Sequence, residues 1–66
     1  MISESTIGYY KYRISYMIDE VSVSFIDIEV VMEDINIIDV FTRNEYRRKG
    51  YSRKLFNYIF DKYKDK

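Results

Sequence analysis

Apolar and polar side chains alternate between residues 9 and 18. The apolar ones occupy the even positions: Tyr10, Tyr12, Ile14, Tyr16 and Ile18. A period of two built from aromatic and β-branched residues predicts a strand with one face toward solvent. The polar pair Asp19-Glu20, which ends this run, predicts a tight hairpin turn.

The alternation continues through residues 21–33, but its phase changes. Apolar side chains occupy odd positions as far as Phe25 and even positions from Ile26 onward. Because an unbroken strand would swap its faces at this point, the change predicts a β-bulge near Phe25-Ile26. Glu33-Asp34 then predicts a second turn.

Residues 35–42 are more continuously apolar, which predicts a third strand covered on both faces. The loop that follows, residues 43–50, is polar and basic and ends at Gly50.

Since bare edges and uncovered faces invite pairing, and one helix is too short to cover this strand and the tyrosines, we expect a homodimer.

Apolar side chains recur at helical spacing after the loop: Tyr51, Leu55, Tyr58, Ile59 and Phe60. This spacing predicts a helix over 51–64, and residues 1–6 are predicted to be a polar tail. The chain, 1–66, is thus expected to be one small α/β domain of the α+β kind. Its expected core is an antiparallel three-stranded sheet followed by one helix (β-β-β-α).

Composition excludes several kinds of chemistry. The 66 residues contain no cysteine and no histidine, so this chain cannot supply a disulfide, a thiolate metal site, a Ser-His-Asp triad or a Cys-His pair. No metal site is expected, because the commonest metal ligands are absent. No membrane partner is expected either, because no apolar run approaches roughly 18 residues. The polar N-terminus lacks a signal pattern, so a cytoplasmic location is expected.

Charge is balanced in total but not along the chain. Residues 1–42 carry two basic and eight acidic side chains, whereas residues 43–66 carry nine basic and three acidic ones. The asymmetry favours an anionic ligand for the C-terminal part, although attraction between the two halves would explain it equally well.

The turn before the predicted helix carries the chemistry. A glycine at this point allows the backbone to approach a ligand closely, and the first helical N–H groups have no partner within the helix. Basic side chains surround the turn: Arg47, Arg48, Lys49, Arg53 and Lys54. The pattern predicts a phosphate-binding turn that is neither a P-loop nor a Rossmann turn. A plain helix start beside a solvated loop is the alternative.

The segment from Ile38 to Leu55 resembles the acetyl-CoA-binding segment of the GNAT N-acetyltransferase superfamily. The family pattern is Gln/Arg-x-x-Gly-x-Gly/Ala between a strand and a helix. Arg47, Gly50 and Ser52 occupy its three defined positions, with Ser52 in place of the usual glycine or alanine. The strands predicted over 9–33 match those that precede this unit in the family.

The resemblance implies a ligand, acetyl-CoA, and an activity, acetyl transfer to an amine. It implies that backbone N–H groups of the turn hold the pyrophosphate and that the strand edge pairs with the pantetheine arm. The residues implied to bind the cofactor are Val40, Phe41, Thr42, Arg47, Arg48, Lys49, Gly50, Tyr51, Ser52 and Arg53. The family's first strand and its acceptor-site elements are expected to be missing, as in a minimal or truncated member.

No catalytic residue emerges from the sequence. Asn36 lies near the position of a glutamate base in some family members, but an amide cannot accept the proton. Asp34 reads as a turn residue. Asp39 lies in an apolar run, where burial would raise its pKa, or else on the less covered face of its strand.

Two other functions stay open at this point. One is a non-catalytic binding or inhibitor protein on the same scaffold, for example a phage-encoded one. The other is nucleic-acid binding through the basic loop, residues 43–54. Nucleic acid is the less expected partner, because the net charge is zero and the acidic strands would repel a long polyanion.

Overall fold

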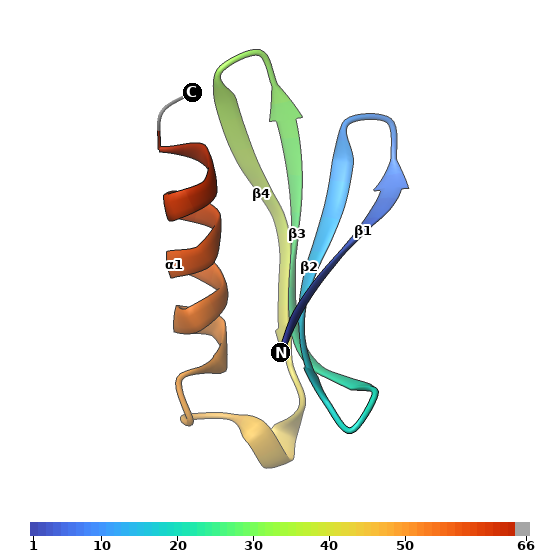
Figure 1. Cartoon of the computed structure of the whole chain (residues 1–66), viewed down its shortest axis with the longest axis vertical. Helices are drawn as coiled ribbons and strands as arrows, with labels where there is room; N and C mark the ends of the chain where they lie inside the picture. Colours follow the sequence, from blue (N-terminus) through green and yellow to red (C-terminus); the bar gives the residue numbers. More distant parts are fainter. Residues whose placement is uncertain (65–66) are drawn as a thin grey trace.

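The chain folds into a four-stranded antiparallel sheet with one helix on one of its faces (Figure 1). The computed structural model describes residues 1–64. Its strands are β1 (Ile2–Gly8), β2 (Lys11–Ile18), β3 (Val21–Val31) and β4 (Asp34–Thr42). A 3-10 turn, η1 (Asn44–Tyr46), leads to the helix α1 (Tyr51–Tyr63). The strands lie side by side in chain order, so the sheet is a meander.

The α+β class is confirmed, but the prediction of three strands is wrong. The segment 1–6, predicted to be a tail, lies in β1 and pairs with β2 from Ile2 opposite Tyr16 to Gly8 opposite Lys11. A polar segment forms this strand because pairing requires backbone partners and not an apolar pattern. Of its two isoleucines, Ile2 packs against the core and Ile7 is exposed.

The turn at Asp19-Glu20 is confirmed. Both residues have positive φ, 50° and 66°, which gives the hairpin the twist that its flanking strands require. The turn between β3 and β4 lies at Met32-Glu33, one residue earlier than predicted. Each of these turns contains two residues, so the strands they join must be antiparallel neighbours.

The predicted bulge exists but lies elsewhere. Tyr16 pairs with Ser24 and Met17 with Ser22, which leaves Val23 as the extra residue of β3. The pattern misplaced it because Phe25 is an apolar residue on the solvent face. A second bulge lies in β4, where Asp39 pairs with Asp27 and Ile37 with Ile28, so Ile38 is extra.

The core lies between the sheet and α1. Leu55 and Ile59, one helical turn apart, are fully buried against Ile14, Ile26 and Ile28 of the two central strands. Burying a side chain of this size contributes roughly 1.5–3 kcal/mol. This cluster therefore fixes the helix across the middle of the sheet.

The prediction that residues 35–42 are covered on both faces is wrong. β4 is an edge strand, and its side chains at Ile37, Ile38, Val40 and Phe41 are all 43–50% exposed. An apolar run shows that a strand could be buried on both faces, but not that the described chain contains elements to cover it. Here α1 packs mainly over β3, so the side chains of β4 stay exposed.

The face opposite the helix is polar, as the alternation in β2 predicted. Arg13 donates from Nε and Nη2 to the two carboxylate oxygens of Asp27, at 2.8 and 3.0 Å, which raises the pKa of Arg13. Its guanidinium lies 3.9 Å from the centroid of the Phe25 ring, and Phe25 packs on Phe41. Arginine and phenylalanine thus replace a second covering layer at this point.

One polar cluster joins β1 to the helix. Lys62 Nζ lies 2.5 Å from Glu4 Oε1, and Tyr58 donates its hydroxyl to Glu4 Oε2 at 2.5 Å. The bonds from Lys62 and Tyr58 lower the pKa of Glu4 below its ordinary value of 4.5. The bond to Glu4 raises the pKa of Lys62 above its ordinary value of 10.5.

Within residues 1–64, no helix is long and apolar enough to cross a membrane.

We predict that Glu4→Gln lowers the free energy of unfolding by about 0.5 kcal/mol at pH 7, since exposed ion pairs contribute little. The lowered pKa of Glu4 means that its contribution is present above pH 4.5 and is lost as the pH falls through that lowered pKa. Urea unfolding should therefore separate the variant from the wild type at pH 7, and the difference should shrink as the pH falls below 4.5. Glu33→Gln, at a glutamate without a salt bridge among residues 1–64, is the control.

We also predict that Glu20→Gly stabilises the protein by about 0.5 kcal/mol. A left-handed conformation costs an ordinary residue roughly 1–2 kcal/mol, and the entropy lost by glycine offsets part of the relief. Glu33→Gly is the matched control, because Glu33 has no positive φ and its substitution should destabilise. Thermal melts that moved both variants in the same direction would contradict this account.

Candidate functional site

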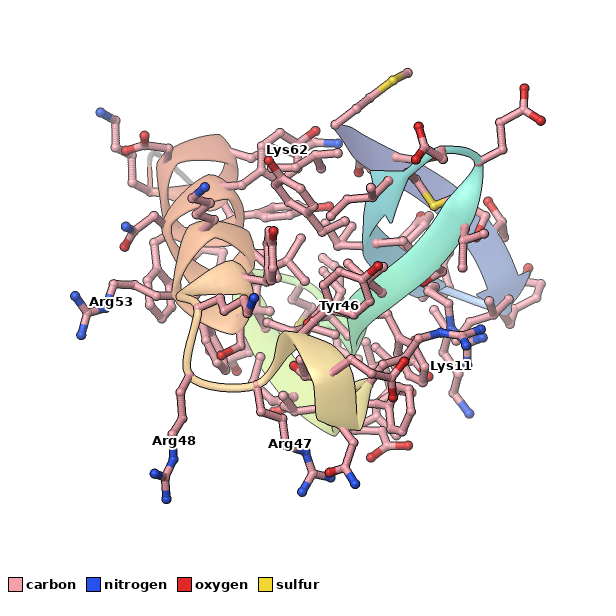
Figure 2. The ribbon with its side chains drawn as sticks, turned by 90° about the horizontal axis from the view of Figure 1, so that it is seen from below. Lys11, Tyr46, Arg47, Arg48, Arg53 and Lys62 are labelled. Atoms are coloured by element: carbon pink, nitrogen blue, oxygen red, sulfur yellow. The ribbon has the colours of Figure 1, made fainter. Side chains whose placement is uncertain are left out.

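A hollow opens where β4 ends and α1 begins. Its volume is about 510 Å³, and it lies at the end of the molecule seen in Figure 2. Three segments form it: the end of β4, the loop and the first turn of α1. Their lining residues are Val40, Thr42, Tyr46, Arg47, Arg48, Gly50, Tyr51, Ser52 and Arg53.

Eight of the ten predicted cofactor-binding residues line this hollow: Val40, Thr42, Arg47, Arg48, Gly50, Tyr51, Ser52 and Arg53. Lys49 is exposed and does not line it. The side chain of Phe41 also lies outside, packed on Phe25 with 5.3 Å between ring centroids. Phe41 was predicted to act through its backbone, which its side-chain position does not address.

Tyr46 lines the hollow and was missing from the predicted set. Its ring lies 5.9 Å from that of Tyr51, which in turn lies 4.8 Å from that of Tyr16 in β2. The three tyrosines tie the loop and the helix start to the sheet. The signal in the sequence was the position of Tyr46 directly before Arg47, inside the motif.

The backbone of the turn alternates in handedness. Arg48 has a φ of 63° and Gly50, the N-cap of α1, a φ of 83°. Alternation of this kind turns successive N–H groups toward a shared concave side, as in anion-binding nests. A Cβ built on Gly50 would meet no atom within 4 Å, so glycine is favoured here by its positive φ and not by crowding.

The first turn of α1 has no cap. Its first backbone bond runs from the N–H of Lys54 to the carbonyl of Gly50, at 3.1 Å, and no side chain bonds to the N–H groups before it. The turn also holds no acidic residue but does hold Arg53, next to the positive end of the helix dipole. This arrangement is unfavourable without an anion and suits one well.

The arginines of the hollow stay free of carboxylates. Within residues 1–64, Arg47, Arg48 and Arg53 form no salt bridge, and no acidic side chain lines the hollow. Figure 2 shows these three side chains extending outward around the loop and the helix start. Arg47 is anchored through its Nε, which donates to the carbonyl of Thr42 at 3.2 Å.

The edge of β4 presents backbone groups beside the hollow. The carbonyl of Phe41 accepts from Ser24 Oγ at 3.0 Å, and the N–H of Arg43 donates to the carbonyl of Val23 at 2.8 Å, so both face β3. The alternation of an antiparallel ladder then turns the groups of Val40 and Thr42 toward the free edge. The N–H of Val40 bonds there to Asp39 Oδ1 at 2.9 Å.

The possible bases of β4 do not reach the hollow. Asp39 is exposed, as expected for a polar group on the less covered face of its strand. Asp34 is the first residue of β4, and Asn36 is also exposed. Among residues 1–64 no group of three or more acidic side chains could hold a metal ion. The hollow thus has the charge for anion binding, and no carboxylate of residues 1–64 lines it.

The chain matches no known family model, no curated protein and no solved structure. The resemblance to the GNAT segment therefore stays a prediction from the sequence.

Proposed function

We propose that the protein binds acetyl-CoA or CoA in this hollow, as a GNAT-like protein. The observation that carries the proposal is an uncapped helix start behind Gly50, surrounded by three arginines that form no salt bridge within residues 1–64. The pyrophosphate is the part of CoA that such a site recognises best, because it accepts several N–H bonds at once. The motif at Arg47, Gly50 and Ser52 supports CoA over other pyrophosphates.

Each part of the site has a role in the proposed complex. The N–H groups from Arg48 to Arg53 hold the pyrophosphate, and the guanidinium groups neutralise its charge. The pantetheine arm follows the free edge of β4, where Val40 and Thr42 turn their backbone groups outward. Pairing at Val40 requires its N–H to leave Asp39 Oδ1, and pairing at the Thr42 carbonyl requires it to share or release Arg47 Nε, so these bonds are exchanged for bonds to the ligand.

Turnover is the less supported part of this proposal. Acetyl transfer requires a group or a water path that takes a proton from the amine, and among residues 1–64 no carboxylate lines the hollow, whose proton-transferring side chains are the weakly acidic Tyr46 and Tyr51. N-acetyltransferase activity is therefore proposed only with acceptor-site groups from outside the hollow. This lining without a carboxylate favours the second candidate, a non-catalytic binding or inhibitor protein on the same scaffold. A cytoplasmic location, where CoA is available, remains part of the proposal.

We predict that CoA raises the melting temperature. Ligand at 100 times its dissociation constant adds roughly 2.7 kcal/mol to the stability of a protein that binds it only when folded. Calorimetry and thermal melts with CoA, and with inorganic phosphate at the same ionic strength, provide the measurement. An unchanged melting temperature at millimolar CoA would rule out the proposed function.

We predict that Gly50→Asn weakens CoA binding about tenfold or more, while the fold survives. Asparagine tolerates a positive φ, but its side chain would project into the open space beside Gly50. Gly50→Val should lose both binding and stability, because a β-branched residue resists this φ. Arg43→Ala, in the same loop but outside the lining of the hollow, should bind CoA normally. Normal binding by Gly50→Asn would show that no ligand approaches this turn.

A further inference from the structure

β4 is the apolar edge of the sheet. Four of its large hydrophobic side chains are exposed, at Ile37, Ile38, Val40 and Phe41, whereas β1, the other edge, exposes Ile7 alone. Bulges and charged side chains oppose the pairing of an exposed strand edge with another strand. Both edges of this sheet carry a bulge, between Thr6 and Gly8 in β1 and at Ile38 in β4, so their apolar side chains are what distinguishes them. The two edges therefore differ in kind, and β4 is the one suited to a partner.

The backbone groups that β4 turns outward define the possible pairings. Val40 and Thr42 point their N–H and C=O groups to the free edge, as described above. Two of these groups already have partners within the chain, the Val40 N–H at Asp39 Oδ1 and the Thr42 carbonyl at Arg47 Nε, so pairing exchanges these bonds for bonds to the second copy. The bulge at Ile38 shifts by one residue which backbone groups face outward. Before the bulge, Ile35 and Ile37 are therefore the residues that point their N–H and C=O groups to the free edge. These four residues lie opposite β3 residues whose side chains are on the face of the sheet that α1 covers: Val30, Ile28, Ile26 and Ser24.

We propose that two copies of this chain pair through their β4 edges, antiparallel, with Ile37 opposite Val40 and Ile35 opposite Thr42 of the second copy. This register opposes all four outward-facing residues, and it places paired side chains on the same face of a continuous sheet. Shifting the register by one residue would set outward-facing groups against inward-facing ones. The proposal does not depend on CoA binding.

Charge complementarity supports the same register. Asp34 at the start of β4 would lie opposite Arg43 of the second copy, and the two-fold axis repeats this pair at the other end. The alternative register centred on Asn36 would bring Glu33 against Asp39 of the second copy, and like charges directly opposite destabilise a sheet. The chosen register also sets Ile37 against Val40, which removes two exposed apolar side chains from water in each copy.

A charge exchange tests the register. In a homodimer of Asp34→Arg, the new arginine would lie opposite Arg43 of the second copy. In a homodimer of Arg43→Asp, the new aspartate would lie opposite Asp34 of the second copy. In sedimentation equilibrium with ligand-free protein, we expect the wild type to dimerise and each variant to dimerise at least tenfold more weakly. An equimolar mixture of the two variants should form a heterodimer, because both of its end pairs are complementary. Failure of the mixture to associate, beside a dimeric wild type, would overturn this register.

A second pair of variants tests the edge itself. Ile37→Lys would bury an ammonium group against Val40 of the second copy and should leave a folded monomer by circular dichroism. Val21→Lys is the matched control, because Val21 is exposed to the same extent, 43%, but lies in β3 at the hairpin turn. Equal dimerisation of both variants, or a wild type that stays an 8.1 kDa monomer at high micromolar concentration, would refute the pairing of β4 edges.

Discussion

The packing of one helix against two central strands holds this molecule together. Leu55 and Ile59 close over Ile14, Ile26 and Ile28, and these are five of its six fully buried apolar side chains. A domain of about 60 residues buries only about 60% of its unfolded surface, so little stability remains in reserve. Every other feature, including the open edge of β4, depends on this contact.

The same contact positions the candidate site. Docking α1 over the sheet brings its uncapped first turn to the end of β4, and the tyrosines at 16, 46 and 51 hold the loop between them. Arg53 lies there at the positive end of the helix dipole and no acidic residue occupies the first turn, a departure from local rules that is typical of binding sites. The edge of β4 then enters both proposals, since pantetheine and a second copy would use the same outward groups of Val40 and Thr42.

Local patterns predicted the features that depend on local forces. The hairpin at Asp19-Glu20, the helix after Gly50 and most of the hollow follow from spacing and from one motif. β1 was missed because a polar edge strand has no apolar period, and the bulge was misplaced because Phe25 lies on the solvent face. The exposure of β4 was not predictable either, because an apolar run does not say whether the described chain covers it.

The meander has a consequence for the order of folding. Neighbouring strands are joined by two-residue turns, so the sheet forms through contacts close in sequence, which is the fast route for a β-rich chain. The helix depends on distant contacts, of which that between Glu4 and Lys62 spans 58 residues. During synthesis the sheet therefore emerges before its cover, with Ile14, Ile26 and Ile28 facing water. The hollow assembles last, when the C-terminal helix docks.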